Sequence, residues 1–128
     1  MRSKMSLLAG TATLSLAQAT SLADVCTSSY ARSVAPSSPL MGVTVDTTSI
    51  TANPVYNYSS ASTAFWPAST FDFCNVTLGY THDGLDDQVL LQFWLPAPAD
   101  FKNRWLSTGG FGYAINGDSA DLPGGVMY

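Results

Sequence analysis

Two runs of alternating apolar residues, one on each side of an Asp-Gly pair, constrain this chain most. Apolar and polar residues alternate along 76–80, and four apolar residues share one face of 88–95. Asp83-Gly84 lies between the runs, and this pair favours a tight turn between antiparallel strands. We therefore predict an antiparallel hairpin over 76–95, which Pro96 ends because proline cannot donate to a strand ladder.

Prolines punctuate the region before this hairpin, in a stretch rich in Ser, Thr and Ala over 27–70. Proline at this frequency excludes a long helix and favours extended segments and turns. We predict short strands over 42–46 and 49–51 and no clear helix. The segment 24–70 is interpreted as an N-terminal extension that packs over a larger body.

The first 23 residues have the layout of a secretory signal peptide. Two basic residues open the chain, an apolar run follows over 7–16, and small residues then provide two alternative cleavage points, after Ala23 and after Ala19. The run is shorter than the roughly 20 apolar residues that span a membrane. We predict a signal peptide over 1–23, with 19 as the other cleavage point, and a secreted, extracellular protein without a membrane partner. The alternative is an N-terminal core helix.

The chain has two cysteines, Cys26 and Cys74, both after the predicted cleavage points. In an oxidising compartment an even pair is most simply one disulfide, and the alternative is two buried free thiols. Closing this loop of about 48 residues would stabilise the fold by about 4 kcal/mol in the chain-entropy description. Asn57 and Asn75 each begin an Asn-x-Ser/Thr triplet, which makes them candidate glycosylation sites.

Charge and histidine content exclude several kinds of site. The chain has nine acidic and five basic residues and no basic cluster, which argues against nucleic acid as a partner. His82 is the one histidine and no Cys-x-x-Cys occurs, so we expect no metal and no cofactor. Asp86 and Asp87 supply too few oxygens for calcium and are interpreted as a solvated turn. Ser119 and His82 have no spacing that supports a catalytic dyad.

A glycine-rich loop is the segment that most directly indicates a catalytic function. We predict a short strand over 104–108, which leads directly into Gly109-Gly110-Phe111-Gly112. In α/β-hydrolases the loop after the third strand donates backbone N–H groups to the oxyanion hole, and glycine lets the substrate carbonyl approach. Each such donor lowers the barrier by about 3–4 kcal/mol. Gly109 and Gly110 are the candidate oxyanion residues, and the alternative is a plain turn.

Several segments together resemble the fungal tannase and feruloyl esterase family of secreted esterases. They cover roughly residues 70–128 and comprise Cys74–Thr77, Tyr80–His82, Asp86–Gln92, Trp94–Pro96, Asn103–Arg104, Leu106–Gly110, Gly112–Ile115 and Leu122–Val126. The resemblance implies an α/β-hydrolase fold with a large inserted lid, and a Ser-His-Asp acyl-enzyme mechanism. It implies small or polymer-linked phenolic esters, of the gallate or ferulate type, as substrates. It also implies that Cys26 pairs with Cys74.

The same resemblance places the catalytic triad outside these 128 residues. Family members are several-fold longer, and their serine lies in a Cys-Ser-x-Gly-Gly elbow beyond the point that matches Tyr128, with Asp and His further on. We therefore expect an N-terminal fragment that is inactive alone, with 71–128 as the truncated start of the core. The fragment would hold the extension, the first hairpin and the strand that leads to the oxyanion loop.

A second class of function stays open. A small secreted β-rich module without catalysis would bind carbohydrate or polyphenol through aromatic side chains such as Trp66, Trp94 and Trp105, or would be purely structural. Trp94 and Trp105 fall within predicted strands, where packing into the core is the commoner role of tryptophan.

Overall fold

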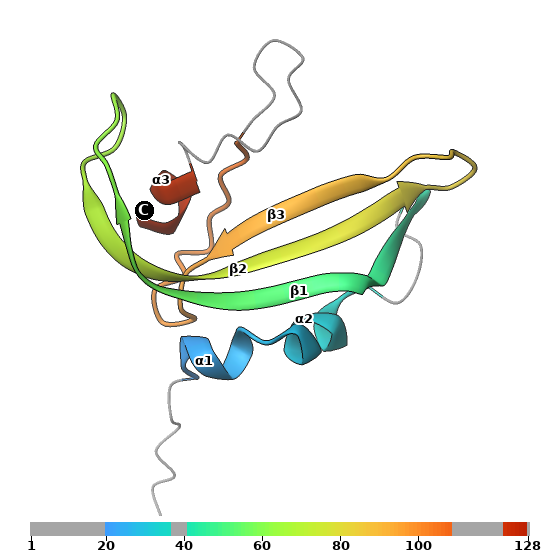
Figure 1. The fold of residues 1–128 in the computed structure, drawn as a ribbon, viewed down its shortest axis with the longest axis horizontal. Helices are drawn as coiled ribbons and strands as arrows, with labels where there is room; N and C mark the ends of the chain where they lie inside the picture. The colour runs from blue at the N-terminus through green and yellow to red at the C-terminus, as the bar shows by residue number, and fades with distance from the viewer. Residues whose placement is uncertain (1–19, 37–40, 109–121, 128) are drawn as a thin grey trace, which may run out of the picture.

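The computed structural model describes residues 20–36, 41–108 and 122–127. These residues form three short helices and three strands (Figure 1). In chain order the elements are α1 (Leu22–Val25), α2 (Ser28–Val34), β1 (Val43–Ser60), β2 (Ser69–His82), β3 (Val89–Leu95) and α3 (Leu122–Met127).

The strands form one curved antiparallel sheet in the order β1-β2-β3. Helices α1 and α2 lie along β1 on one side of the sheet, and α3 lies on its other side (Figure 1). The predicted hairpin is β2–β3, in register from Tyr80 opposite Val89 to Cys74 opposite Leu95. Its turn contains Gly84 at φ 82°, a left-handed conformation that glycine adopts without a steric penalty.

Strand β1 differs from the prediction of two short strands over 42–46 and 49–51. It is a single strand of 18 residues with two register shifts against β2. Pro54 lies in its middle. Among the described residues β1 pairs with β2 on one side only, and such an edge strand tolerates a proline because its other side has no ladder to complete. Asn57 takes a positive φ of 54° in the second irregular stretch, where its backbone N–H donates to Asp72 Oδ1 at 2.8 Å. The bulges therefore let one long strand follow the curvature of β2.

The expectation of no clear helix was wrong at both ends of the described chain. Helix α2 has seven residues and stops before Pro36, so the prolines limit helix length rather than prevent helices. Thr27 caps it by accepting a hydrogen bond from the backbone N–H of Tyr30 at 3.2 Å. Helix α3 carries Pro123 in its first turn, where a missing backbone N–H costs little.

The strand predicted over 104–108 was also wrong. These residues are described and have no regular secondary structure. A strand exists only with a hydrogen-bonded partner, and among the described residues β3 pairs with β2 alone. An irregular segment therefore follows β3 at the position where a strand was predicted.

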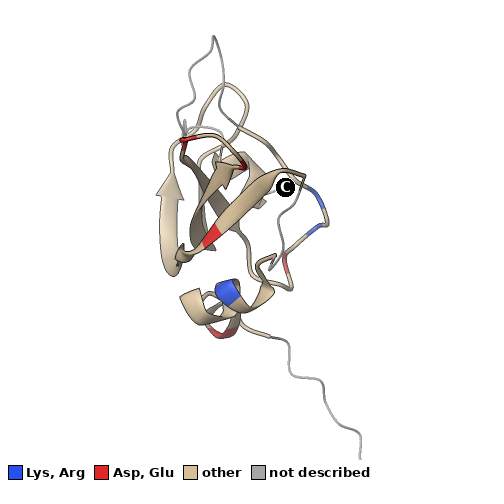
Figure 2. Cartoon of the chain, turned by 90° about the vertical axis from the view of Figure 1, so that its right-hand side faces the viewer, with Lys and Arg blue, Asp and Glu red and all other residues tan. Residues whose placement is uncertain are grey.

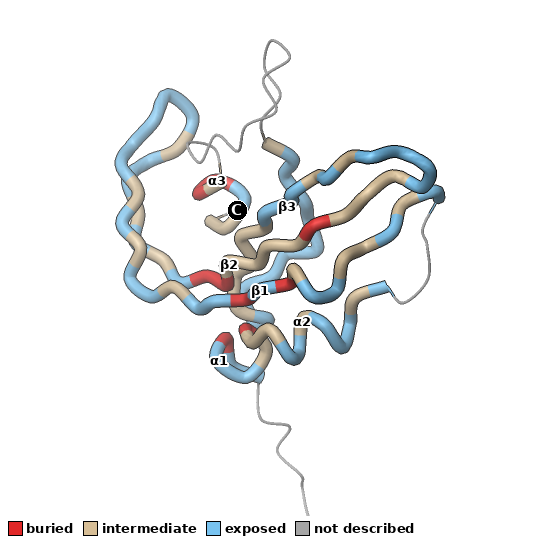
Figure 3. The backbone as a smooth tube through the Cα atoms, turned by 45° about the vertical axis from the view of Figure 1, so that its right-hand side comes forward, coloured by how far each residue is buried: buried red, intermediate tan, exposed pale blue. Residues whose placement is uncertain are grey.

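One buried cluster, of Leu22, Cys26, Ala52 and Cys74, lies where the N-terminal helices meet β1 and β2 (Figure 3). Phe73 is 2% exposed, and its ring stacks on Trp94 with centroids 4.1 Å apart. Trp94 is therefore a packing residue, as the strand pattern indicated. By contrast, Phe65, Leu90 and Trp105 are each more than two thirds exposed. The buried apolar residues are Leu22, Cys26, Ile50, Ala52, Phe73 and Cys74.

Basic residues do not gather on the described surface (Figure 2). The described segments hold Arg32 on α2 and Lys102 and Arg104 after β3. Arg32 is committed to the fold, because its Nη2 donates to the carbonyl of Ile50 at 3.0 Å. No helix within the described ranges has the length and apolarity needed to cross a membrane.

Candidate functional site

The predicted oxyanion residues, Gly109 and Gly110, lie outside the described residues, and so does Ser119. The structure does describe both flanks of that loop, which are the segment 104–108 and helix α3. Leu106 and Gly125 come from the two flanks, and a Cβ built on Gly125 would lie 3.3 Å from the Cβ of Leu106. The chain therefore leaves and re-enters the loop at nearly the same place, beside β3.

A pocket of about 60 Å³ marks this junction. Its walls come from the end of β3, the following segment and α3: Gln92, Phe93, Trp94, Leu95, Pro96, Phe101, Arg104, Trp105, Leu106, Thr108, Leu122 and Gly125. Such a volume holds a few water molecules, since one water needs roughly 10–15 Å³. Sites for small organic ligands are about 300 Å³ or more. The described residues around this junction thus do not by themselves form a pocket for such a ligand.

Helix α3 is held in place by Trp66, from the connection between β1 and β2. The Trp66 ring lies directly on the helix backbone, so that a Cβ added at Gly124 would overlap three atoms of the indole. Pro123 and Gly124 are both buried. Glycine is required at position 124 because only a residue without a side chain lets the indole approach this closely. This contact fixes the downstream flank of the glycine loop against the sheet.

Phe101 and Trp105 support the upstream flank. The two rings meet edge to face with centroids 5.8 Å apart. The ring of Trp105 also meets that of Phe93 on β3 edge to face, with centroids 6.4 Å apart. Edge-to-face aromatic pairs of this kind are worth about 0.5–1.5 kcal/mol beyond their buried area. Aromatic contacts, rather than a strand ladder, therefore hold the segment after β3 against the sheet.

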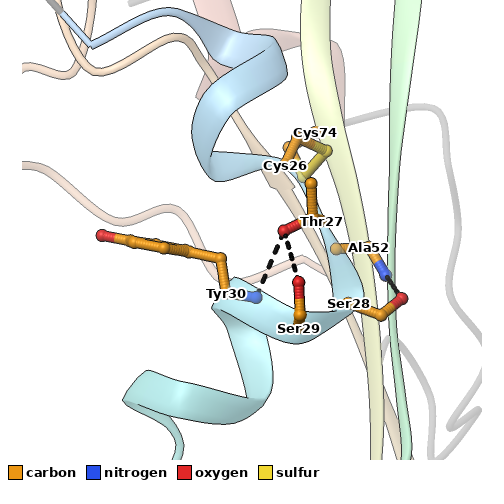
Figure 4. Close-up of a disulfide and its surroundings, with 7 residues drawn as sticks. All are labelled: Cys26, Thr27, Ser28, Ser29, Tyr30, Ala52 and Cys74. Carbon is orange, nitrogen blue, oxygen red and sulfur yellow. Dashed lines mark hydrogen bonds between the residues drawn. A yellow bond between two sulfur atoms is a disulfide. The ribbon is translucent and has the colours of Figure 1, made fainter.

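The two N-terminal helices are tied to the sheet by a disulfide between Cys26 and Cys74, whose Cα atoms are 5.5 Å apart (Figure 4). Beside it, Ser28 Oγ accepts a hydrogen bond from the backbone N–H of Ala52 at 3.1 Å. The disulfide joins the end of α1 to β2, and the hydrogen bond joins the first residue of α2 to β1. Both sulfur-bearing residues are at most 4% exposed, so the link lies inside the core.

His82 and Asp87 form a pair at the far end of the hairpin. His82 Nδ1 lies 2.6 Å from Asp87 Oδ2, and the His82 backbone N–H donates to Asp87 Oδ1 at 2.9 Å. The hydrogen bond from the His82 side chain, followed by the one from its backbone, holds the pKa of the Asp87 carboxyl below its ordinary value. His82 lies eight positions along β2 from Cys74, which pairs with Leu95 at the end of β3, or about 26 Å of strand. This pair is a turn clamp remote from the loop junction.

Sequence reasoning treated Asp87 as solvated and missed its histidine partner. The signal was present, because an Asp-Gly turn brings the residues on either side of it together. The structure places His82 at the end of β2, paired with Asp87 across the turn.

The two sequons occupy different environments. Asn57 is exposed in the irregular part of β1. Asn75 is half-buried on β2, and its Oδ1 accepts a hydrogen bond from Gln92 Nε2 at 3.0 Å. Across 20–36, 41–108 and 122–127, no three or more His, Cys, Asp or Glu residues come together in a way that would hold a metal ion.

Comparisons with known proteins agree on one group of enzymes. The chain is 38% identical to a tannase of Aspergillus oryzae over 113 residues, which is 88% of this chain and 18% of that protein. It is 40% identical to a probable feruloyl esterase of Arthroderma benhamiae over 48 residues, which is 38% of this chain and 9% of that protein. No family model matches.

A solved structure gives the same result. The fold matches that of tannin acyl hydrolase from Aspergillus niger with a TM-score of 0.78 and 54% sequence identity. The match covers 85% of this chain and 20% of that enzyme. The chain thus spans a fifth or less of the length of each of these relatives. The resemblance to tannases and feruloyl esterases is confirmed.

Proposed function

This chain is a relative of tannase and feruloyl esterase, and we propose that it is the N-terminal part of a secreted carboxylic ester hydrolase. The match to tannin acyl hydrolase carries the proposal, because it joins 54% identity with the same fold over 85% of the chain. A small antiparallel sheet with a core of six buried apolar residues does not by itself indicate an ester hydrolase. The relationship supports the reaction class, and the α/β-hydrolase fold belongs to the complete enzyme that we propose.

The proposed reaction is acyl transfer. A serine attacks the ester carbonyl, a histidine takes and returns the proton, and an aspartate orients the histidine. We place all three outside these 128 residues. The part assigned to this chain is the oxyanion hole, to which Gly109 or Gly110 would donate a backbone N–H.

The contacts on both flanks support that assignment. Catalytic donors are effective when they are held within about 0.5 Å of the productive position. The Trp66–Gly124 contact anchors one flank of the loop and the Phe101–Trp105–Phe93 contacts anchor the other. Support of this kind on the flanks is what a preorganised donor needs.

We propose esters of phenolic acids as the substrates, either small or linked to a polymer, and of the gallate or ferulate type. The junction pocket of about 60 Å³ is too small for a phenolic ring and an ester. Substrate binding therefore needs residues beyond the described ones, and we expect the fragment to be inactive alone. Secretion is part of the proposal, with Asn57 as the preferred glycan acceptor because it is exposed.

The test is ester hydrolysis by the secreted product of the longest reading frame that contains this sequence. Methyl gallate and methyl ferulate are the probes, and release of either acid supports the proposal. If the loop forms the oxyanion hole, the side chain of Gly109→Val should keep the substrate carbonyl away from the backbone N–H and lower kcat about 10²–10³-fold, as loss of one donor does. Ser107→Ala, at an exposed position in the same segment, is the matched control and should leave kcat unchanged. Hydrolysis of neither ester would overturn the proposed function.

One observation favours a second candidate, a binding module without catalysis. Trp105 is 71% exposed and Phe65 is 78% exposed, and exposed aromatic rings are suited to stacking on sugars or polyphenols. Trp94 does not contribute, because it stacks on Phe73. Binding of tannic acid or cellulose by the complete secreted protein, without ester hydrolysis, would select this candidate.

A further inference from the structure

The first helix of the fold begins between the two alternative cleavage points of the export signal. Signal peptidases recognise small side chains one and three residues before the cleaved bond. Ala17 and Ala19 satisfy this requirement, and so do Ser21 and Ala23. The sequence alone therefore permits both bonds, whereas the two products differ in what they leave of helix α1.

Ser21 and Asp24 form a reciprocal cap on α1. The Ser21 backbone N–H donates to Asp24 Oδ2 at 2.9 Å, and the Asp24 backbone N–H donates to Ser21 Oγ at 3.3 Å. The Ser21 hydroxyl also donates to Asp24 Oδ2 at 2.6 Å. These bonds hold the pKa of the Asp24 carboxyl below its ordinary value, with the side-chain bond as the largest cause. Such a capping box satisfies backbone donors that a helix start otherwise leaves unpaired.

Leu22 is part of the core that surrounds the disulfide. Its side chain is 7% exposed and belongs to one buried cluster with Cys26, Ala52 and Cys74. Its carbonyl oxygen accepts a hydrogen bond from the Cys26 backbone N–H at 2.8 Å. The Leu22 side chain therefore packs beside the disulfide, and the Leu22 carbonyl holds the backbone of Cys26 in place.

We propose that the export signal is removed at the bond between Ala19 and Thr20, so that the mature protein keeps Ser21 and Leu22. In this step a signal peptidase adds water across the amide bond, which leaves a carboxylate on Ala19 and an α-ammonium group on Thr20. Cleavage after Ala23 would instead remove the cap and Leu22 and would expose the disulfide cluster. The inference rests on the proposed export of the chain.

The direct test is N-terminal sequencing of the protein that a fungal host secretes from the longest reading frame containing this sequence. The expected N-terminus is Thr20. A secreted protein that begins at Asp24 would overturn this inference and leave export intact. A product that stays in the cell with its leader attached would overturn the proposed export, and the cleavage inference with it.

Two leucine substitutions separate cleavage from folding, because a large side chain directly before the bond disfavours cleavage there. Ala23→Leu blocks the second bond at an exposed position, so the protein should still begin at Thr20 and be secreted at the wild-type level. Ala19→Leu blocks the first bond, and secreted protein should fall several-fold, because loss of Leu22 destabilises what is made. Equal secretion of an Ala19→Leu product that begins at Asp24 would contradict the role given to Leu22.

A third variant tests Leu22 without changing the cleavage site. Leu22→Ala keeps Thr20 as the N-terminus and removes only the buried side chain. Its secreted level should fall as that of Ala19→Leu does. If Leu22→Ala is secreted and resists protease as well as the wild type does, the retained segment has no structural function and the inference fails.

Discussion

Loss of the Cys26–Cys74 disulfide should weaken the attachment of helices α1 and α2 to the sheet. The bond spans 48 residues of sequence, a loop that contains α2, all of β1 and the first part of β2. Replacing both cysteines by alanine removes the cross-link without leaving a reactive thiol. In the chain-entropy description a loop of this length is worth about 4 kcal/mol. Because about 1.4 kcal/mol corresponds to a factor of ten, opening of this region should become about 10³-fold more frequent.

Native-state amide hydrogen exchange measures that opening directly in the complete protein. Peptides from β1 and β2 should exchange about 10³-fold faster in the double alanine variant, since exchange follows the free energy of local opening. Ser28→Ala is the matched control, because it removes the Ser28–Ala52 hydrogen bond at the same seam and keeps the cross-link. A hydrogen bond contributes about 0.5–1.5 kcal/mol, so this control should accelerate exchange by about tenfold at most.

Comparing exchange in these two variants shows whether the disulfide or the neighbouring contacts stabilise this region. If exchange in the double alanine variant rises no more than in Ser28→Ala, the disulfide does not hold α1 and α2 on the sheet. The attachment would then lie in the apolar contacts of the core, and the reasoning from loop length would be refuted.

Two further predictions concern packing and the turn clamp. Gly124→Ala should destabilise the fold by about 1–3 kcal/mol, because the added methyl group overlaps the ring of Trp66. Gly125→Ala is the control and should destabilise the fold less. Thermal unfolding of both variants checks this prediction, and equal unfolding midpoints would contradict it. The pKa of Asp87 is lowered from 3.8 by bonds from His82, so its contribution to stability is present above pH 3.8 and is lost as the pH falls through the lower folded-state value. Asp87→Asn should therefore be less stable than the wild type at neutral pH, and the difference in stability should shrink in acid. Urea unfolding at several pH values measures this difference. A constant difference across the pH range would refute the role given to the Asp87–His82 pair.

The hairpin was predictable because its information is local. Alternation on both sides of Asp83-Gly84 specifies two strands and their turn, and the observed register follows from it. The length of β1 was not predictable in the same way. Its Ser and Thr content and Pro54 resemble a loop, and its strand state comes from pairing with β2, a partner distant in sequence.

The errors at the helices and after β3 have related causes. Ser21 and Thr27 are readable N-cap signals, yet α1 and α2 are too short for a helical period to appear in the pattern. The segment 104–108 has apolar residues typical of a strand, and aromatic contacts hold it in an irregular form instead. Gly109 and Gly110 stay predictions, since they lie outside the described residues.

The most direct test of the central claim is the sequence of the transcript through and beyond the codon of Tyr128. If this chain is part of a carboxylic ester hydrolase, the frame continues and encodes a serine in a Cys-Ser-x-Gly-Gly elbow, followed by an aspartate and a histidine. A stop codon directly after Tyr128 would give a protein without a nucleophile, and the catalytic account of this chain would be wrong.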